Sequence, residues 1–457
     1  MSARPVGSAS PIQRLIPRFV LAAAKSDSGK TTLALGLITA LRRRGLAVAA
    51  AKVGPDFIDA AHLSRASGRP ARNLDAWLAS EDAVRESFVR GCGNADAAVV
   101  EGVMGLFDGR HGSGEGSTAH VARILDAPVV LVLDCAKTSA TIGAIAHGLA
   151  GFDPRLRIAG VILNRVASDR HAATVCDAVR SANLRVFGTM RTDDGIALES
   201  RHLGLVEPGS EAWTAVVERI ANAVENALDL DALLAEASRV SPLRSPAYDA
   251  AREADVRVGI ARDEAFWFYD EASLDALRDA GAALVPYSPL RDPFPAVDAV
   301  LIGGGYPEMH AAALEANASA RRSLRDAIAA GMPTYAECGG LMYLGRDLST
   351  PDGTHAMVGA VPGSAVMAQR RSALRYVEAR ALCDGPMFAR GDAVRGHEFH
   401  YSKMAYATES PAFGIGDERE GYSRAGLHAS YVHVHLGAQP RGVRRFLDAA
   451  RAFSGGA

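Results

Sequence analysis

The sequence predicts an α/β protein of two domains, and three observations support this prediction. Short apolar runs alternate with helical patterns in the first half of the chain, which is typical of a parallel sheet with crossover helices. A segment rich in Pro and Ser, residues 238–254, interrupts the pattern. A second α/β pattern starts at Val256. We therefore expect a domain over residues 1–237, a linker over residues 238–254 and a second domain over residues 255–457.

The first half contains apolar runs that we interpret as strands and longer periodic segments that we interpret as helices. The expected strands are residues 18–24, 46–53, 97–101, 128–134, 158–164 and 184–188. The expected helices include residues 30–44 and 138–150, and a long amphipathic stretch, residues 211–237, closes this half.

The second half continues the same alternation and then changes character. The expected strands are residues 256–261, 283–286, 299–302 and 333–336, and the expected helices are residues 271–280, 311–330 and 442–453. The stretch 356–435 is richer in short strands and turns.

Length and composition exclude several classes of protein. With 457 residues, 48% hydrophobic and 22% charged, the chain is long enough for a large core and too balanced to be disordered. Lys and Arg number 50 against 52 Asp and Glu, so no overall field draws the protein to nucleic acid or anionic lipid. The five cysteines form no CxxC pair, and the apolar run 19–24 is too short for a signal peptide or membrane span. We expect a cytoplasmic protein.

A phosphate-binding loop is expected between the first strand and the first helix. The run SDSGKTT, residues 26–32, has the strand before it and the helix after it that such a loop needs. Backbone N–H groups attract phosphate oxygens, Lys30 neutralises the outer phosphates, and Thr31 can hold Mg²⁺. The pattern departs from GxxxxGK[ST], because Ala24 replaces the first Gly. Lys25 matches the extra lysine of ParA-like ATPases, or is a solvated loop lysine.

Two further segments follow expected strands, at the sheet edge where ligands bind in parallel sheets. They are KVGPDFID, residues 52–59, and EGVMGLFDG, residues 101–109. Carboxylates in such places hold Mg²⁺ and orient a substrate, although any one of them alone could cap a turn. The acids concerned are Asp56, Asp59, Glu101 and Asp108, one of them beside Lys52. Asn164 lies at the end of another expected strand. It either contacts the base of the nucleotide or belongs to a simple turn.

The candidate nucleophile is Cys338. It lies between an apolar strand and a helix in the run YAECGGL, residues 335–341. Gly339 and Gly340 permit a sharp turn that exposes the sulfur at a helix N-terminus, where the dipole favours the thiolate. The other four cysteines fit the buried, inert role that is usual for this residue.

A base for the thiolate is expected in YVHVH, residues 431–435. Period-two alternation places His433 and His435 on one face of a strand, so both are candidates. They could also be a metal pair, but no third ligand is evident. HEFH, residues 397–400, lacks the four-residue spacing of HExxH, so we expect a structural or substrate-contacting role there.

A glycine run follows the strand 299–302. It is GGGYPE, residues 303–308. Its backbone N–H groups could form an oxyanion hole for a thioester-forming attack, or the run is a plain glycine turn.

In combination, these motifs resemble the cobyrinic acid a,c-diamide synthase family, including its hydrogenobyrinic acid branch, over nearly the full chain. The runs that carry the resemblance are SDSGKTT (26–32), KVGPDFID (52–59), EGVMGLFDG (101–109), STAHVARILDAPVVLVLD (117–134), IGGGYPE (302–308), AECGGLMYLG (336–345), GHEFHYSK (396–403) and ASYVHVHLG (429–437). The resemblance implies an N-terminal, parallel-sheet P-loop NTPase domain like dethiobiotin synthetase. It also implies a C-terminal class I glutamine amidotransferase domain with a flavodoxin-like, three-layer fold.

The resemblance also implies roles for individual residues. Cys338 is similar to the glutaminase nucleophile and His433 to its base. The other implied contacts are with the oxyanion or glutamine (Gly304, Gly305 and Gly339), ATP (Ser28, Gly29, Lys30, Thr31, Thr32 and Asn164), the substrate (Lys52, Asp56, Phe57, Asp59 and Asp108) and Mg²⁺ (Thr31, Asp56 and Glu101).

The implied chemistry forms an acyl phosphate on an acetate side chain of the corrin with Mg²⁺ and ATP. Ammonia released from glutamine then displaces the phosphate, at carboxylates a and c. The implied partners are cobyrinic or hydrogenobyrinic acid, glutamine and ATP, and a homodimer is compatible with the family. The alternatives are diamidation of nickel-sirohydrochlorin, a ParA-like ATPase switch without amidotransferase activity, and a nucleotide-stimulated Cys hydrolase.

Two departures from the family pattern affect the candidate sites. Phe57 stands where the family commonly has Tyr, so a hydroxyl contact to substrate is absent there. Class I amidotransferases typically follow the catalytic His with Pro-Glu, and the Glu orients it. Val434 and His435 stand there instead, which leaves His435 as a candidate for the orienting residue.

Overall fold

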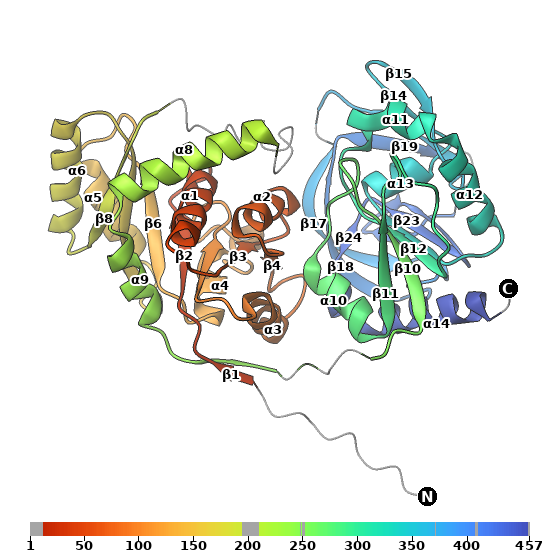
Figure 1. Ribbon diagram of the computed structural model, residues 1–457, viewed down its shortest axis with the longest axis horizontal. Coiled ribbons are helices and arrows are strands. Elements are labelled where there is room, and N and C mark those ends of the chain that lie inside the picture. Colours follow the sequence, from red (N-terminus) through yellow and green to blue (C-terminus); the bar gives the residue numbers. More distant parts are fainter. Residues whose placement is uncertain are drawn as a thin grey trace, which may run out of the picture. The chain divides into compact units, whose positions relative to one another are not determined.

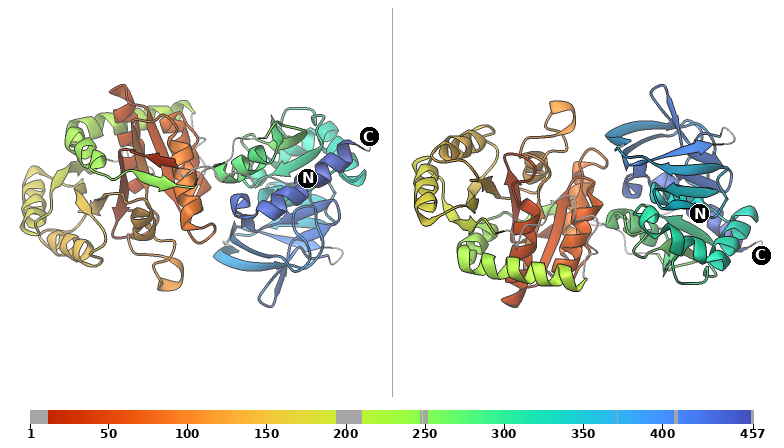
Figure 2. Two further views of the ribbon diagram at one scale, coloured as in Figure 1. Left: turned by 90° about the horizontal axis from the view of Figure 1, so that it is seen from below. Right: turned by 90° about the horizontal axis from the view of Figure 1, so that it is seen from above.

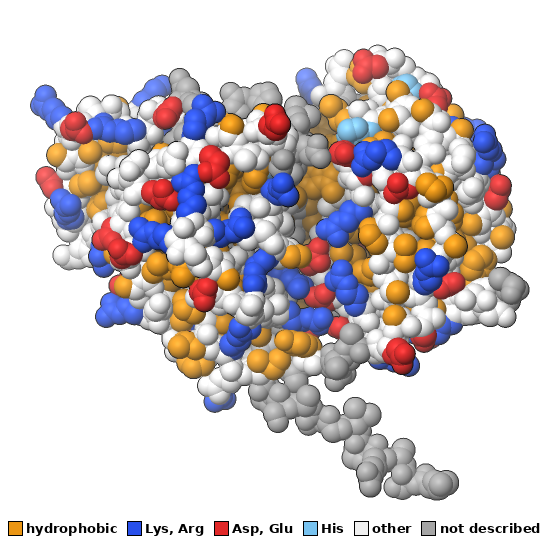
Figure 3. Space-filling model, in the orientation of Figure 1, with side chains coloured by type: hydrophobic (Ala, Val, Ile, Leu, Met, Phe, Trp, Pro, Cys, Tyr) orange, Lys and Arg blue, Asp and Glu red, His pale blue; other side chains and the backbone are white. Residues whose placement is uncertain are grey.

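The computed structural model describes residues 12–193, 210–246, 248, 252–370, 372–406 and 410–455. The chain divides into two compact units, Met1–Tyr248 and Asp249–Ala457, and each is described by itself (Figure 1). No helix among the described residues is long and apolar enough to cross a membrane. On the face drawn in Figure 3, acidic and basic side chains are interspersed, in keeping with the balanced charge of the sequence.

The first unit is built around a seven-stranded sheet in which all neighbouring strands are parallel, as predicted. The strand order is β4-β3-β5-β2-β6-β7-β8. The strands are β2 (Arg18–Ala23), β3 (Val48–Val53), β4 (Arg72–Leu74), β5 (Ala97–Glu101), β6 (Val129–Asp134), β7 (Ile158–Val166) and β8 (Val186–Arg191). The helices are α1 (Lys30–Arg43), α2 (Phe57–Ser67), α3 (Glu81–Cys92), α4 (Thr118–Ile124), α5 (Thr141–Gly151), α6 (Asp169–Ser181), α8 (Glu211–Ala227) and α9 (Leu230–Ser238).

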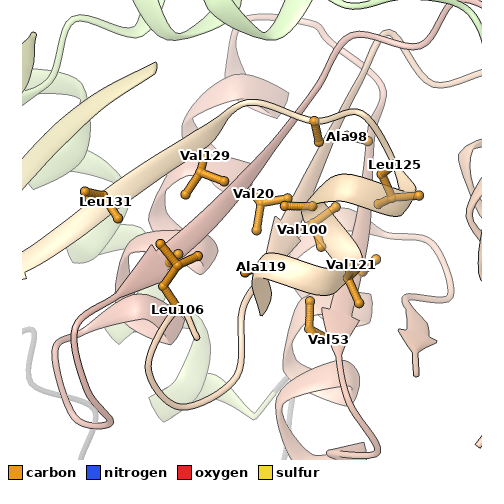
Figure 4. Packing of buried hydrophobic residues seen from close by; sticks show 14 of the residues in the cluster. Val20, Val53, Ala98, Val100, Leu106, Ala119, Val121, Leu125, Val129 and Leu131 are labelled. Atoms are coloured by element: carbon orange, nitrogen blue, oxygen red, sulfur yellow. The ribbon is translucent and has the colours of Figure 1, made fainter. Parts of the chain in front are cut away.

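Helices cover both faces of this sheet because its central strands are apolar on both faces. Val20 and Val100 belong to a buried cluster with side chains of α4, and Figure 4 shows these side chains facing one another. Their neighbours along the strands, Leu21 and Val99, belong to a second cluster with α1 and α8. The unit is therefore a three-layer α/β structure, with its loops at the sheet edges.

The second unit contains a six-stranded sheet of order β11-β10-β12-β13-β23-β22. Five of these strands are parallel: β10 (Val256–Ala261), β11 (Ala282–Tyr287), β12 (Ala299–Ile302), β13 (Thr334–Glu337) and β23 (Leu427–Ser430). In chain order they follow the pattern 2-1-3-4-5, which is the flavodoxin-like order that the resemblance implies. The edge strand β22 (Tyr422–Arg424) is antiparallel. The helices are α10 (Glu271–Asp279), α11 (Ala311–Ala316), α12 (Ala318–Ala329), α13 (Gly339–Leu344) and α14 (Pro440–Ser454).

Most strands of the strand-rich stretch predicted at residues 356–435 belong to two smaller sheets, which also include β14 and β15 just before it. One has the order β15-β14-β16-β19 and the other β21-β20-β17-β18-β24. Their strands are β14 (Asp347–Thr350), β15 (Gly353–Ala356), β16 (Gly363–Met367), β17 (Ala373–Ala381), β18 (Ala393–His400), β19 (Ser402–Tyr406), β20 (Phe413–Ile415), β21 (Glu418–Glu420) and β24 (His433–Val434). In Figure 2, the blue strands of this unit gather on one side and the teal helix α12 lies on the other.

Two helices expected from the sequence are each divided into two. Residues 211–237 form α8 and α9, because the chain is extended at Leu228 and the side chain of Asp229 caps α9. Residues 311–330 form α11 and α12, with Asn317 capping α12 in the same way. In both places a side-chain oxygen accepts from a backbone N–H and starts a new helix. Amphipathic periodicity continues through such a break and does not reveal it.

A buried arginine, Arg18, connects the beginning and the end of the first unit by hydrogen bonds. Strand β1 (Ile12–Arg14) pairs with β9 (Leu243–Ser245), which lies within the segment 238–254. Arg18 is 0% exposed, and its guanidinium donates four hydrogen bonds. The acceptors are the backbone carbonyls of Ile16, Leu125, Asp126 and Ser241. One side chain thus satisfies carbonyls from segments more than 200 residues apart in the sequence.

Replacing Arg18 by Met should lower the free energy of unfolding of the first unit by about 3 kcal/mol, because buried carbonyls lose their donors. The matched control is Arg44→Met. The Arg44 guanidinium contacts the exposed Asp231, so its loss should lower the free energy of unfolding by less than about 0.5 kcal/mol. Urea denaturation followed by Trp fluorescence measures both. Equal losses in the two variants would show that the buried hydrogen bonds of Arg18 add no stability.

Candidate active sites

The expected phosphate-binding loop lies between β2 and α1, and a side chain from β7 supports it. Gly29 caps α1 with a φ of 89°. Asn164 Nδ2 donates to the carbonyl of Ser28 at 2.9 Å. A Cβ on Gly29 would lie 2.2 Å from that same nitrogen. Glycine is therefore required both by the backbone conformation and by the close approach of Asn164.

Lys30 begins α1 and points back across the loop. Its Nζ donates to the carbonyl of Met104 at 2.7 Å and to that of Lys25 at 3.3 Å. Burial, assisted by the positive charge of Lys52, lowers the pKa of Lys30. An anionic phosphate near Nζ would compensate both effects, which is the role the sequence predicts for this lysine. Thr32 lies in the same first turn of α1, half-buried.

Four predicted residues meet in one buried network where β3 and β5 end. Lys52 and Glu101 are register partners on these neighbouring strands. Lys52 Nζ lies 2.7 Å from Glu101 Oε1 and 2.6 Å from Asp59 Oδ2. Thr31 Oγ1 donates to the same Glu101 Oε1 at 2.6 Å. The parallel sheet thus brings together the two strand ends that the sequence singles out.

Burial controls the protonation of the acids in this network. It raises the pKa of Glu101 to about 7, against the attraction of Lys52. Burial and the neighbouring Asp59 raise the pKa of Asp56 to about 6. Burial also disfavours the ionised form of Asp59, but Lys52 outweighs it and holds the pKa of Asp59 below its usual value. Asp59 is therefore the acid that balances the charge of Lys52.

The network fits a divalent cation. Among the described residues, no hydrogen-bond donor reaches Glu101 Oε2, although this oxygen is buried. The Thr31 hydroxyl shares the other carboxylate oxygen. Hard oxygen atoms of this kind are the ligands that Mg²⁺ prefers. The described residues contain no group of three or more His, Cys, Asp or Glu that could hold a metal by themselves, so such a cation would need oxygens from a bound phosphate as well.

The remaining predicted residues of the first unit lie around this network. Asp56 caps α2 and accepts from the backbone N–H of Asp59 at 3.0 Å, and Phe57 is the first residue of that helix. Asp108 is exposed, and its carboxylate accepts from Gly105 N–H at 2.8 Å. The sequence analysis missed Asn73, whose amide donates to the carbonyl of Asp56 at 3.1 Å.

The candidate nucleophile Cys338 occupies a strained turn between β13 and α13. Its φ is 49° and its ψ is −104°, a conformation that a non-glycine residue rarely adopts. The side chain is 5% exposed, and its Sγ lies 3.6 Å from the carbonyl of Phe399. Cysteine N–H donates to the carbonyl of Ser430 at 2.7 Å. This is the sharp turn, or elbow, between a strand and a helix that the sequence predicts, but the prediction of an exposed sulfur was wrong, because Cys338 is buried. Of the four cysteines expected to be buried, Cys92 and Cys135 are buried, whereas Cys176 and Cys383 are only partly buried.

The glycines predicted for the oxyanion site pack tightly around this elbow. A Cβ on Gly339 would lie 3.2 Å from the backbone nitrogen of Gly305. A Cβ on Gly304 would lie 2.6 Å from Cε1 and 3.2 Å from Nε2 of His433. Only glycine at Gly304 therefore lets the imidazole stand against the glycine loop, next to the predicted oxyanion donors.

His433 lies beside Cys338 and a carboxylate. Its Nδ1 is 3.3 Å from Glu337 Oε2. Burial alone would lower the pKa of His433, but its interactions with Cys338 and Glu337 outweigh burial and raise the pKa to about 10. The ring of His397 stacks on that of His433 with centroids 4.9 Å apart, and burial keeps the pKa of His397 well below its usual value. A protonated His433 therefore faces a neutral imidazole.

His435 does not share this environment, although the period-two pattern placed it on the same face. Strand β24 ends at Val434, and His435 Nε2 lies 3.0 Å from Asp270 Oδ2, at the N-terminus of α10. Glu337, which the sequence analysis did not assign, is the carboxylate next to His433. The available signal was an acid directly before the cysteine in a chain that has no acid at the second position after the histidine.

Comparison with known proteins assigns a family to each half of the chain. A family model described as the CobQ/CobB/MinD/ParA nucleotide binding domain matches residues 19–206. A model described as the CobB/CobQ-like glutamine amidotransferase domain matches residues 257–441. The chain is 45% identical to the cobyrinate a,c-diamide synthase of Syntrophotalea carbinolica, over 96% of this chain and 99% of the relative. The chain belongs to this family.

Two other members show that the family includes both branches named in the sequence analysis. A cobyrinate a,c-diamide synthase of Gloeobacter violaceus is 43% identical, over 94% of this chain and 96% of the relative. A hydrogenobyrinate a,c-diamide synthase of Streptomyces coelicolor is 42% identical, over 95% of this chain and 98% of the relative. The resemblance stated from the motifs is thereby confirmed. The phosphate loop lies within the matched nucleotide-binding range, and Cys338 and His433 lie within the matched amidotransferase range.

Substituting Gly29→Ala should weaken nucleotide binding at least tenfold, because the new Cβ would displace Asn164 and the loop that it supports. Gly45→Ala is the matched control: its φ of 86° imposes a similar backbone strain, and no atom lies within 4 Å of its Cβ position. Titration calorimetry with a nucleoside triphosphate compares the two variants. Equal weakening in both would attribute the effect to general strain rather than to the loop.

Proposed function

We propose that this chain is a glutamine-hydrolysing ligase that amidates the a and c acetate carboxylates of cobyrinic or hydrogenobyrinic acid at the expense of ATP. The observation that carries the proposal is the pairing of Cys338 with a protonated His433 in a chain that also holds a phosphate loop beside a buried acid network. One site releases ammonia and the other activates a carboxylate. The names of the relatives supply the corrin substrate.

The glutaminase step uses the elbow at Cys338. The thiolate attacks the side-chain amide carbon of glutamine, and N–H groups of Gly305 and Gly339 stabilise the negative oxygen. As the C–N bond breaks, His433 gives its proton to the departing ammonia. Water then attacks the thioester, the C–S bond breaks, and glutamate leaves. Gly304 keeps the imidazole within reach of the reacting atoms.

The activation step uses the phosphate loop. A carboxylate oxygen of the corrin attacks the terminal phosphorus of ATP, which yields an acyl phosphate and ADP. Ser28, Gly29, Lys30, Thr31 and Thr32 hold the phosphates in this proposal, and Asn164 supports the loop from β7. Ammonia then attacks the acyl carbon, phosphate leaves, and an amide with one released proton remains. Two rounds convert carboxylates a and c.

Substrate and metal ion are assigned to the strand ends. Lys52, Asp59, Asp56 and the loop with Asp108 would orient the carboxylate side chain, and Phe57 would contribute only apolar contact because it has no hydroxyl. Glu101, Thr31 and Asp56 would hold Mg²⁺, which supplies positive charge to the transferring phosphoryl group when bound.

The proposal carries two further expectations. The reaction would take place in the cytoplasm, where ATP is available and where the five free cysteines remain thiols. The active assembly would be a homodimer, which light scattering on the purified protein tests. A ParA-like switch is the competing function, but it leaves Cys338 and His433 without a role.

Cys338→Ala should abolish glutamine-dependent amidation and leave amidation with added ammonia within about twofold of wild type, since only the nitrogen source is lost. Mass spectrometry of cobyrinic and hydrogenobyrinic acid incubated with Mg-ATP measures carboxyl-to-amide conversion, with ADP release in parallel. Retained glutamine use would refute the nucleophile. Glutamine hydrolysis without conversion of either corrin would refute the substrate, and nickel-sirohydrochlorin would be tested next.

Glu101 should make Mg-ATP binding depend on pH. A cation binds the ionised carboxylate, and the pKa of Glu101 is about 7. Affinity should therefore rise as the pH increases from 6 to 8, by up to ~10-fold per unit below the pKa, with protons released on binding. Calorimetry in buffers of different ionisation enthalpy measures the release. Glu101→Gln, compared under the same conditions, should reduce this dependence and leave only the part that ends near pH 6, where Asp56 titrates. A variant with the wild-type profile would exclude Glu101 from the metal site.

A further inference from the structure

The amidotransferase unit has a carboxylate next to the imidazole, but on a strand other than that of the histidine. Class I enzymes usually place the orienting acid two residues after the histidine. Here that position is His435, which contacts Asp270. Glu337 instead belongs to β13, directly before Cys338, and its Oε2 lies 3.3 Å from His433 Nδ1. The acid and the nucleophile are thus neighbours in sequence, and the base comes from β24.

Glu337 is held rigidly in this position. Its Oε1 accepts from the Tyr335 hydroxyl at 2.7 Å and from the backbone N–H of Val434 at 2.9 Å. Tyr335 is 1% exposed, and its ring stacks on His428 with centroids 5.3 Å apart. The Glu337 carboxylate therefore contacts both the imidazole of His433 and the backbone N–H of the next residue, Val434. Such fixed partners are what a residue needs in order to orient a base.

Glu337 provides the carboxylate among the titratable groups around His433. The titratable groups that interact with His433 include Cys338 and Glu337 from the elbow, and His397 and His400 from β18. Burial lowers the pKa of both histidines, so they add no positive charge near neutral pH. Glu337 is the carboxylate beside the His433 imidazole, and its interaction helps to raise the pKa of His433.

We propose that Glu337 is the positioning residue of the amidotransferase site and completes a Cys338–His433–Glu337 triad in which the acid precedes the nucleophile. By holding Nδ1, it directs the opposite edge of the ring to the sulfur, where the proton for the departing ammonia is needed. The inference rests on the proposed glutaminase role of Cys338 and His433. It adds the source of the third member, which the segment after the histidine does not provide.

The test compares Glu337→Gln and Glu337→Asp with a matched control in the full-length protein. Glu337→Gln preserves size and removes the charge, and Glu337→Asp preserves the charge. The control is Asp270→Asn, which removes the charge from the other buried carboxylate–histidine contact in this region and keeps a good helix cap. Two readouts are used: steady-state glutamine hydrolysis, and the pH profile of Cys338 alkylation by iodoacetamide. Ammonia-dependent amidation reports whether the activation site remains intact.

Glu337→Gln should lower kcat for glutamine by ~30- to 100-fold with KM within about twofold, and should move the rise of alkylation to higher pH by about one unit or more. Glu337→Asp should recover at least ~tenfold of the lost kcat. Asp270→Asn should keep the wild-type profile. The inference is wrong if Glu337→Gln has the wild-type kcat and the wild-type alkylation profile. It is also wrong if Glu337→Asp loses as much kcat as Glu337→Gln and Asp270→Asn shifts the alkylation profile by the same amount.

The design separates this inference from the proposed function. If Cys338→Ala still hydrolyses glutamine, the proposed function itself fails. If Cys338→Ala is inactive with glutamine and the Glu337 variants behave like wild type, only the triad is overturned. Should Glu337→Gln fail to fold, Glu337→Ala takes its place with the same expected loss of kcat and the same expected shift of the alkylation profile, and wild-type values in that variant would contradict the inference.

Discussion

The parallel direction of the strands is the constraint on which both sites depend. The strands of a parallel sheet all have their carboxyl ends on the same side of the sheet. Segments that are distant in the sequence therefore meet there. This brings Lys52 of β3 to Glu101 of β5 in the first unit. In the second unit it brings the end of β13, with Cys338, beside the end of β23, which leads to His433. The groups gathered there are largely buried, which strengthens the electrostatic interactions between them.

Because the ionisable groups of each site are buried, the protonation of each group depends on the charges of its neighbours. In the first unit, the ammonium groups of Lys30 and Lys52 interact with buried acids in a place from which water is largely excluded. Asp59 stays ionised beside Lys52, while the pKa values of Glu101 and Asp56 rise towards neutrality. In the second unit, burial lowers the pKa of His397, whereas interactions with Cys338 and Glu337 raise the pKa of His433. Similar side chains thus acquire different protonation states from their neighbours.

Close backbone approach is the second requirement shared by the sites. Gly29 admits the Asn164 amide to the phosphate loop, and Gly304 admits the His433 imidazole to the glycine loop. At both places a side chain from a different strand supports a loop that carries N–H groups. The loops are therefore shaped by tertiary contacts as well as by their own sequence, which is how rigid sites are built on flexible segments.

Local patterns in the sequence determined most of the architecture. Residues 97–101, 256–261 and 299–302 were predicted as strands with the bounds that the structure has, because their apolar runs end abruptly at turn residues. The phosphate loop and the Cys338 elbow were also predictable, since each depends on a few consecutive residues between a strand and a helix. The family, too, could be identified from short runs.

Only the tertiary structure decided which side chains meet. Glu337 accepts a hydrogen bond from the backbone N–H of Val434, 97 residues away in the sequence. Asn164 donates to the carbonyl of Ser28, 136 residues away. Periodicity carries no information about such contacts, because it reports the face of an element and not its neighbours. For the same reason it grouped His435 with His433, although β24 ends between them and His435 contacts Asp270. The sequence by itself therefore determined the strands, the loops and the candidate nucleophile, while packing decided the orientation and charge of the groups around them.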